Sequence, residues 1–459
     1  MLKDVHYTID AADAKPIYWV AGPLAIETQY ASYQAYFKAQ GFIGKAGQTC
    51  VLSDRAGVTE AVFVGIGEES LSTALSIAAS SLPEGKYRLQ ESYSEDVLIY
   101  WALAQYSFQS FKVQNLPSRV LVVTPAHFSS LKIMREALYL VRDLINQPAN
   151  VLTPEHFAEQ ALALGRSFGA TATVWTGEEL LEEFPAVYTV GKASASAPRM
   201  VCLSNGDPKH PLVALVGKGV CFDSGGLDIK TGSSMLLMKK DMGGAAHALG
   251  LAHWIWSLNL PIHLMVWLPI VENAIGSNAM RPSDIIRMRN GLTVEIDNTD
   301  AEGRLILADA LTAACEKKPE LLIDFATLTG AARVALGPDI SAFFSNDAVL
   351  AKELLQASEA TRDPLWQLPL FAPYKAFIDS KIADTLNSGG SGYAGAIVAA
   401  LFLQFFVPNN IPWVHFDMMA WNLTDKPGKP MGGEAMALRA VMHYLQGRFG
   451  SPRLSEKKV

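Results

Sequence analysis

Apolar, strand-like runs alternate with helical patterns through the middle of this chain, and no other feature restricts its fold as strongly. Strands are predicted at 212–217, 262–269, 293–297 and 321–325, and helices at 243–258 and 303–317. Strands separated by helices pair in parallel, because each helix carries the chain back to the start of the next strand. The pattern therefore predicts a mostly parallel sheet with helices on both faces.

The sequence ahead of this alternation has a different texture. Residues 1–125 carry short apolar runs at 61–65, 97–100 and 120–123, which we interpret as strands among Ala- and Ser-rich helical stretches. An amphipathic helical pattern at 129–145 then ends at Gln147-Pro148, and Thr153-Pro154 begins the next helix. We expect a smaller N-terminal α/β domain (1–125), a linker helix (126–148) and a larger C-terminal α/β domain (149–459).

Composition and charge exclude several classes of protein. Half of the residues are apolar and 18% are charged, so the chain can bury large cores and is not a disordered protein. The formal net charge of −7 argues against a broad electrostatic grip on nucleic acid. The longest apolar run, 394–407, is too short to span a bilayer and predicts a buried helix. Four scattered cysteines and the lack of a secretory signal pattern predict a cytoplasmic, reduced protein.

Ionisable residues and glycines gather in three segments, 216–230, 238–244 and 297–305. In the last, Asp300 and Glu302 stand two apart and would face the same side of an extended chain, with Arg304 next at that period. Asp223 and Asp241 lie in the other two segments, beside glycines that let backbone approach a ligand. An isolated Asp-x-Glu would be a solvated turn. Four converging carboxylates instead need divalent cations such as Mn, Mg or Zn, and a pair of metal ions suits hydrolysis.

Other catalytic motifs do not fit the sequence. The nine histidines include no H-E-x-x-H pair, and Phe222 stands where a dinucleotide fingerprint needs its third glycine. No G-x-x-x-x-G-K-[ST] phosphate loop occurs. The segment 389–393 ends in tyrosine where a nucleophile elbow requires glycine, so it is better interpreted as a flexible loop. Zincin, nucleotide-binding and serine hydrolase functions therefore lose support.

Four longer segments carry a resemblance to a known family. They read NTDAEGRL at 298–305, VGKGVCFDSGGLDIK at 216–230, MKKDMGGAA at 238–246 and DFATLTGA at 324–331. Taken in their order along the chain, they resemble the leucyl aminopeptidase (cytosol aminopeptidase) family of dinuclear metallopeptidases, over about residues 140 to 450. The resemblance implies that 149–459 is a catalytic aminopeptidase domain that hydrolyses the N-terminal residue from peptides.

The resemblance also implies the site residues. The ligands of two divalent ions, Mn or Zn or alternatively Mg, would be Lys218, Asp223, Asp241, Asp300 and Glu302. As a ligand, the lysine would have to be neutral. A second lysine, Lys230, would stay charged and stabilise the oxyanion, and Arg304 would hold a bicarbonate ion that acts as general base.

Substrate specificity and assembly are implied as well. The pocket for the first side chain would be lined by Met238, Thr327 and Gly330, with a backbone carbonyl from Leu328, and would prefer leucine or methionine. Glu434, in a segment that departs from the family pattern, would favour a basic first residue if it faced this pocket, and would otherwise be a solvated helix-start residue. Family members form homohexamers. Some also bind DNA through the N-terminal domain, which is the alternative function here.

Overall fold

The structure is a computed structural model that describes residues 6–450, and these form two compact units. One unit runs up to Tyr139 and also includes Thr424–Met431, whereas the other consists of Leu140–Leu423 and the chain from Gly432 onward. Helix α5 (Pro125–Asn146) is continuous across the first boundary. These bounds differ from the predicted 1–125, 126–148 and 149–459. The predicted architecture, a smaller α/β unit joined by a helix to a larger one, is confirmed.

The first unit is built on a six-stranded sheet with the order β1-β6-β5-β2-β4-β3, in which only β3 runs antiparallel to its neighbour. Its strands are β1 (Tyr7–Thr8), β2 (Lys15–Val20), β3 (Thr49–Ser53), β4 (Thr59–Gly65), β5 (Gly85–Leu89) and β6 (Arg119–Val122). Its helices before α5 are α1 (Pro23–Thr28), η1 (Ala31–Tyr33), α2 (Gln34–Ala39), α3 (Leu71–Ser81) and α4 (Glu95–Leu103).

One predicted strand of this unit is wrong. The apolar run 97–100 lies inside α4, which begins after Ser94 and carries Glu95 and Asp96 in its first turn. Acidic residues there complement the helix dipole. The run is buried on every side, and a short, fully buried apolar run has no periodicity that separates a strand from a helix.

The larger unit contains a nine-stranded sheet with the order β16-β15-β18-β14-β9-β11-β8-β7, and β10 also pairs with β11. Neighbours pair in parallel except at β15–β18, β11–β8 and β8–β7, so the sheet is mostly parallel, as predicted. The strands are β7 (Thr171–Trp175), β8 (Arg199–Asn205), β9 (Leu212–Gly217), β10 (Gly219–Asp223), β11 (His263–Asn273), β14 (Leu321–Ala326), β15 (Ser341–Ser345), β16 (Leu365–Gln367) and β18 (Trp413–Asp417).

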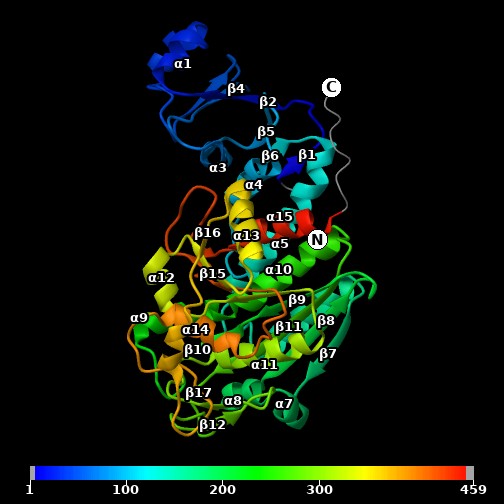
Figure 1. The fold of residues 1–459 in the computed structure, drawn as a ribbon. Helices are drawn as coiled ribbons and strands as arrows, with labels where there is room; N and C mark the ends of the chain where they lie inside the picture. The colour runs from blue at the N-terminus through cyan, green and yellow to red at the C-terminus, as the bar shows by residue number, and fades with distance from the viewer. Residues whose placement is uncertain (1–5, 451–459) are drawn as a thin grey trace. The chain divides into compact units, whose positions relative to one another are not determined.

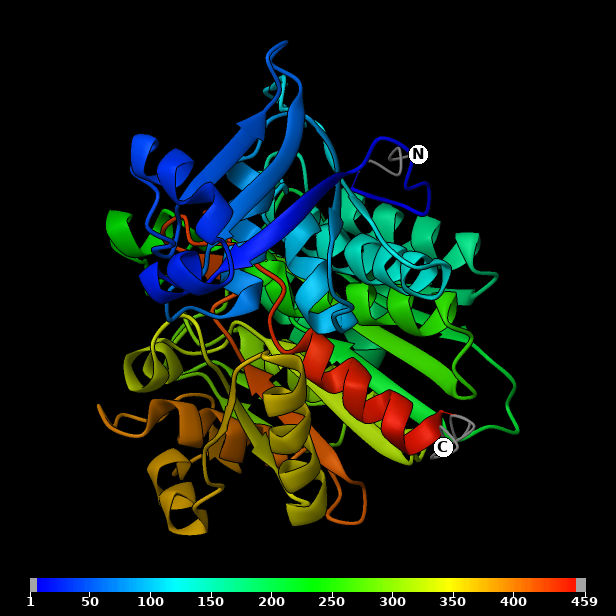
Figure 2. The same cartoon turned by 90° about the horizontal axis from the view of Figure 1, so that it is seen from above.

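Helices cover both faces of this sheet, with α10 and α15 on one face and α8 and α11 on the other (Figure 1). Helix α13 packs beside α15, as the ochre and red helices show in Figure 2. The helices are α6 (Pro154–Ser167), α7 (Gly177–Glu183), α8 (Pro185–Gly191), α9 (Gly232–Met235), η2 (Met238–Met242), α10 (Gly243–Ser257), α11 (Gly303–Glu316), α12 (Gly330–Leu336), α13 (Ala348–Thr361), η3 (Ala372–Ile378), α14 (Gly395–Gln404) and α15 (Leu438–Phe449).

Local sequence explains several of these elements. Thr153 caps α6 by accepting the backbone N–H of His156, as predicted. The apolar run 394–407 forms α14, most of which is buried. Within 6–450, no helix is both long enough and apolar enough to cross a membrane. The predicted strand 293–297 is only β13 (Thr293–Glu295), which lies outside the central sheet.

Strand β13 belongs to a three-stranded sheet with β12 (Ile285–Arg287) and β17 (Thr385–Leu386). A further pair is formed by β19 (Trp421–Asn422) and β20 (Gly432–Gly433). The small sheet has a functional consequence, because the chain leaves β13 towards the acidic segment 297–305.

Two glycines bring the start of α10 against the ends of the strands. A Cβ atom on Gly244 would lie 2.0 Å from the carbonyl oxygen of Phe325 in β14, and one on Gly217 would lie 2.5 Å from Cα of Ala245. Any side chain at these positions would push the helix away from the sheet. The first turn of α10, and η2 just ahead of it, are therefore held at the carboxyl ends of β9 and β14.

Candidate metal centre

The predicted ligands lie at strand ends and helix starts of the larger unit. Lys218 follows β9 and Asp223 is the last residue of β10. Asp241 lies in η2, directly ahead of α10, and Glu302 is the residue before α11. Groups that follow parallel strands meet at one edge of the sheet. The structure accordingly brings these side chains together.

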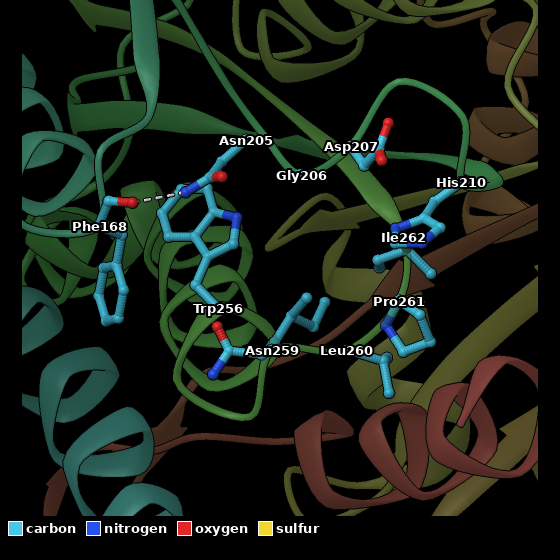
Figure 3. Close-up of a pocket in the computed structure, with 11 residues that line it drawn as sticks. Phe168, Asn205, Gly206, Asp207, His210, Trp256, Asn259, Leu260, Pro261 and Ile262 are labelled. Atoms are coloured by element: carbon cyan, nitrogen blue, oxygen red, sulfur yellow. Dashed lines mark hydrogen bonds between the residues drawn. The ribbon is translucent and has the colours of Figure 1, made fainter. Parts of the chain in front are cut away.

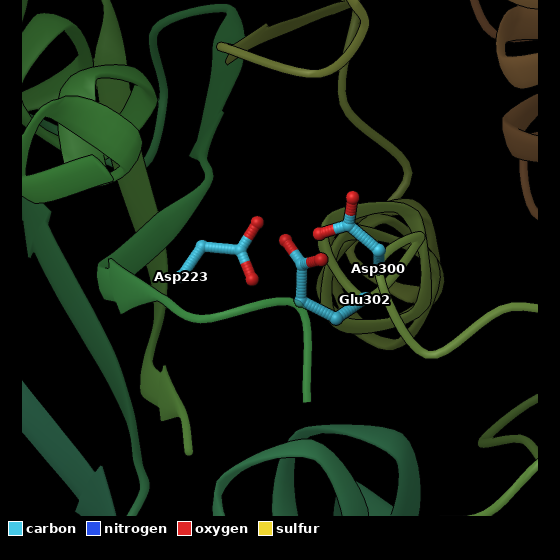
Figure 4. A group of neighbouring side chains, drawn as sticks. All are labelled: Asp223, Asp300 and Glu302. Atoms are coloured by element: carbon cyan, nitrogen blue, oxygen red, sulfur yellow. The ribbon is translucent and has the colours of Figure 1, made fainter. Parts of the chain in front are cut away.

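Three carboxylates form the centre of the cluster. Asp223, Asp300 and Glu302 each have an oxygen within 4.8 Å of the others, and Figure 4 shows the three side chains pointing toward one another. Asp223 and Glu302 are buried, and the side chain of Asp300 is 32% exposed. Oxygens that converge at this spacing on one partly open point are a suitable set for a divalent cation.

Two lysines and a fourth carboxylate complete the cluster. The Nζ atom of Lys218 lies 2.7 Å from Oδ2 of Asp241 and 3.0 Å from Oε1 of Glu302. The Nζ atom of Lys230 lies 2.9 Å from Oδ2 of Asp223 and also pairs with Asp300. Both ammonium groups therefore bridge two carboxylates each.

The charge within the cluster does not balance, because four carboxylates face two ammonium groups. Burial and the charge of Asp223 raise the pKa of Asp300 to about 6, and the same causes raise the pKa of Glu302. Burial alone would lower the pKa of Lys218, but Asp241 and Glu302 outweigh it and raise that pKa. Carboxylates with raised pKa values would be stabilised by additional positive charge.

The donor set fits metal ions. Buried oxygens of Asp241, Asp300 and Glu302 have a lysine ammonium close by but no further hydrogen-bond donor within the described residues. Each ionised carboxylate oxygen has two lone pairs, so an oxygen paired with one ammonium can still bind an ion. Cations held by carboxylate oxygens would remove the repulsion that raises these pKa values.

Arg304 lies beside the cluster, but the extended backbone that we predicted for residues 300–304 is wrong. Glu302 already has helical backbone angles, so the chain turns into α11 instead of staying extended, and Arg304 lies in the first turn of that helix. The guanidinium is buried. Its Nη1 donates to the carbonyl oxygen of Asn387 at 2.8 Å, and its Nε has no partner among the described residues. Burial lowers the pKa of Arg304 to about 10, so the group still carries its charge at neutral pH.

Of the predicted substrate residues, Thr327 contacts a proposed ligand directly. Thr327 follows β14, and its hydroxyl donates to Oδ1 of Asp241 at 2.7 Å, so it orients that carboxylate. Met238 begins η2 and is half-buried. Leu328 is half-buried and Gly330 is exposed.

Four residues that the sequence reasoning missed hold this machinery in place: Asn273, Thr299, Asn387 and Asp417. Asn273 donates to Oδ1 of Asp223 at 2.8 Å, and the hydroxyl of Thr299 donates to the carbonyl oxygen of Gly225 at 2.6 Å. Asp417 accepts the N–H groups of Leu328 and Thr329, each at 3.0 Å. Asn273 and Asp417 end the strands β11 and β18, so their position at strand ends was the available signal.

Glu434 neither faces the pocket nor lies in solvent. Its two carboxylate oxygens accept from Nη2 of Arg142, both at 3.0 Å, and Asn422 also donates to it. The side chain of Arg142 is fully buried and that of Glu434 nearly so. The carboxylate is therefore a structural partner of Arg142, and its charge is already matched by that guanidinium.

A separate cavity of about 300 Å³ lies at the opposite ends of the strands. It is lined by residues at the start of β11, in the β8–β9 connection and at the end of α10, including Trp256, Asn205 and His210 (Figure 3). It shares no residue with the carboxylate cluster. Its place at the amino ends of β9 and β11 separates it from the candidate metal centre.

Similar proteins were found by sequence and by structure. Residues 139–442 match the model of the cytosol aminopeptidase family, catalytic domain, and residues 10–124 match that of the M17 aminopeptidase N-terminal domain. A probable cytosol aminopeptidase of Syntrophotalea carbinolica is 39% identical, and the match covers 89% of this chain and 90% of that protein.

Two solved structures are also similar. The cytosol aminopeptidase from Coxiella burnetii is 44% identical, with a TM-score of 0.93, over 96% of this chain and 99% of that one. The bottromycin maturation enzyme BotP, solved in complex with Mn, is 32% identical, with a TM-score of 0.85, over 95% of this chain and 100% of that one.

Proposed function

The chain belongs to the cytosol aminopeptidase family and is a peptidase, and from this premise we propose that it is a metal-dependent aminopeptidase with two divalent ions at the carboxylate cluster. The observation that carries the proposal is the convergence of Asp223, Asp300 and Glu302 within 4.8 Å. Two metal ions at such a site activate water and polarise a carbonyl group when they are bound. The proposed ligands are Lys218, Asp223, Asp241, Asp300 and Glu302. Manganese is the first ion to test, because BotP was solved with Mn.

Lys218 and Lys230 differ in surroundings that bear on their roles. Lys218 is buried between Asp241 and Glu302, and as a ligand it would give up its proton, which links metal binding to proton release. Lys230 is part-exposed, and Asp223 and Asp300 raise its pKa although burial opposes them. It therefore stays charged and can stabilise an oxygen that becomes negative during hydrolysis.

Arg304 is the residue we propose to hold a bicarbonate ion. Its Nε lacks a partner among the described residues while Nη1 is fixed on Asn387, so a donor is free for an anion. Bicarbonate, when bound, supplies a general base toward water. A bound anion would also explain why the sequence offers no histidine for this role.

The proposed substrates are peptides with a free N-terminus, and leucine or methionine is the preferred first residue. The residues proposed to bind it are Met238, Thr327 and Gly330, with the backbone carbonyl of Leu328. Family resemblance leads us to propose a cytoplasmic homohexamer. The net charge of −7 weighs against the alternative function as a DNA-binding architectural protein.

A panel of aminoacyl p-nitroanilides, assayed with Mn²⁺, Zn²⁺ and Mg²⁺ separately, tests this function. We expect cleavage of the leucine substrate with Mn²⁺, loss of activity on chelation and recovery when the ion is returned. The Glu302→Ala variant should lose bound metal and turnover together. Glu316→Ala is its matched control, because Glu316 ends the same helix but its exposed carboxylate pairs with Arg289. No cleavage of any substrate with any ion would disprove the proposed function.

A further inference from the structure

Asn387 is a fully buried residue directly after β17. Both the oxygen and the nitrogen of its side-chain amide form hydrogen bonds with one stretch of backbone. Its Oδ1 accepts the N–H groups of Asp297, at 2.9 Å, and Asn298, at 3.3 Å. Its Nδ2 donates to the carbonyl oxygens of Asn298, at 2.8 Å, and Ala301, at 3.1 Å. An amide offers two donors and two acceptor positions, so none is left over.

In the part of the chain that the structure describes, residues 297–301 pair with no strand. Residues 297–302 lie between β13 and α11 in turn and irregular structure. Buried backbone groups in such a segment need side-chain partners. Asn387 donates to the carbonyl oxygen of Ala301, the residue between the proposed ligands Asp300 and Glu302 in the sequence. The side chain therefore fixes the peptide group that leads into Glu302, and it holds the backbone on either side of Asp300.

The backbone of Asn387 extends the same restraint to Arg304. Its carbonyl oxygen accepts from Nη1 of Arg304 at 2.8 Å, and its N–H donates to the carbonyl oxygen of Glu295 at 2.9 Å. Asp297 reciprocates, because its carboxylate accepts the N–H groups of Ser388 and Gly389, each at 2.8 Å. The segments 295–301 and 387–389 thus hold each other from both sides.

We propose that Asn387 is a positioning residue that sets Asp300, Glu302 and Arg304 in register with one another. The inference rests on the proposed function, because it takes Asp300 and Glu302 as metal ligands. Asn387 acts through its hydrogen bonds to the backbone of Asp297, Asn298 and Ala301, which flank Asp300 and lead into Glu302. Partners outside the ligand shell generally contribute about 10–100-fold to metal affinity or activity.

Aspartate at this position isolates the effect, because it has the shape of asparagine. In Asn387→Asp, one oxygen can still accept from Asp297 and Asn298. The other meets the carbonyl oxygens of Asn298 and Ala301 without a proton to donate, which turns two hydrogen bonds into repulsion. Asn387→Ala removes all four bonds.

Asn346→Ala is the matched control. Asn346 also ties backbone on both sides, with Nδ2 donating to the carbonyl oxygen of Ile411 at 2.9 Å and Oδ1 accepting from Trp413 at 2.8 Å, but it has no contact with the cluster. The test uses the full chain and two measurements. Hydrogen exchange on the metal-free protein follows the amides of 296–302, and calorimetric titration with Mn²⁺ gives the affinity.

We expect faster exchange in 296–302 and about 10–100-fold weaker Mn²⁺ binding for both Asn387 variants, with neither change in Asn346→Ala. The inference is overturned if the Asn387 variants exchange and bind Mn²⁺ like the wild type, or if Asn346→Ala weakens Mn²⁺ as much. A wild-type chain that binds no divalent ion would refute the proposed metal centre instead. The exchange measurement would then still decide whether Asn387 holds the segment.

Discussion

Replacement of Gly303 by alanine places one methyl group against the proposed metal centre. Gly303 is the first residue of α11, directly after Glu302. A Cβ atom there would lie 2.3 Å from Cε and 2.6 Å from Nζ of Lys218. Helix propensity alone would favour alanine over glycine by about 1 kcal/mol. Any loss on substitution must therefore come from this contact.

The size of the effect follows from the distances. Ordinary contact begins at 3.4 Å, so the end of the Lys218 side chain has to withdraw by about 1 Å. Its Nζ then leaves the positions 2.7 Å from Asp241 and 3.0 Å from Glu302. Overpacking of this kind generally costs about 1–3 kcal/mol of the free energy of unfolding. Misplacement of a functional group by about 1 Å can cost about 100-fold in rate.

Three measurements check the prediction: turnover of leucine p-nitroanilide with Mn²⁺, Mn²⁺ affinity, and urea unfolding. Gly447→Ala is the control, because Gly447 is an exposed residue of α15 with nothing within 4 Å of its Cβ position. It should gain up to about 1 kcal/mol of stability and keep wild-type turnover. If Gly303→Ala retains both wild-type turnover and wild-type Mn²⁺ affinity, then Lys218 is not part of the centre and the reasoning is wrong.

Three further predictions concern residues around the site. His247 is fully buried: Nε2 accepts the N–H of Met436 and Nδ1 lies 2.6 Å from the carbonyl oxygen of Gly243, and burial lowers its pKa to about 4. The unfolded chain takes up this proton near pH 6.5 and the folded chain only near pH 4, so stability is lost as the pH falls between these values. Between pH 6.5 and pH 4, urea unfolding should show that the wild type loses about 3 kcal/mol more of its free energy of unfolding than His247→Gln does. The same pH dependence in both proteins would contradict this prediction. Glu434→Ala should cost about 3–5 kcal/mol, because it removes the carboxylate from buried Arg142, while the ratio of lysine to leucine p-nitroanilide cleavage stays the same. A changed ratio would indicate that Glu434 does influence which first residue is preferred. Asp417→Ala should raise KM about tenfold without weakening Mn²⁺ binding, because it removes the oxygen that accepts the N–H groups of Leu328 and Thr329, and within 6–450 no hydrogen bond or ion pair joins Asp417 to a proposed ligand. Weaker binding of Mn²⁺ would argue against this division.

The fold was predictable where burial is uniform along the chain. The runs 212–217 and 321–325 are β9 and β14 to within one residue, because a central parallel strand is apolar on both faces. The same signal failed at 97–100, which is part of α4, since an apolar run carries no period. The strand predicted at 293–297 is shorter in the structure and belongs to another sheet, because a local sequence pattern does not reveal pairing partners such as β17.

The site was predictable where charges and glycines stand together in the sequence. Asp223, Asp300 and Glu302 belong to such segments, and they converge in the structure. Asn387 gave no comparable signal, since its hydrogen bonds reach residues 83 (Arg304) to 92 (Glu295) positions away and depend on how β17 pairs with β13. The position of Arg304 likewise depends on where α11 begins, which spacing alone does not determine.

The short segment Thr424–Met431 restricts how this chain could be divided or recombined. The chain leaves the larger unit after Leu423, contributes these residues to the first unit and returns at Gly432. Within the first unit, Gly428 has a positive φ of 71°, and its Cβ position would lie 2.6 Å from the ring of Tyr100 and 2.8 Å from the hydroxyl of Ser76. A fragment that stops at residue 139 would lack this insert, and a fragment that starts at residue 140 would carry it without Tyr100 and Ser76. Exchange of the first unit with that of a relative would thus need three crossover points in the gene, after residues 139, 423 and 431, so the two units are expected to be inherited together.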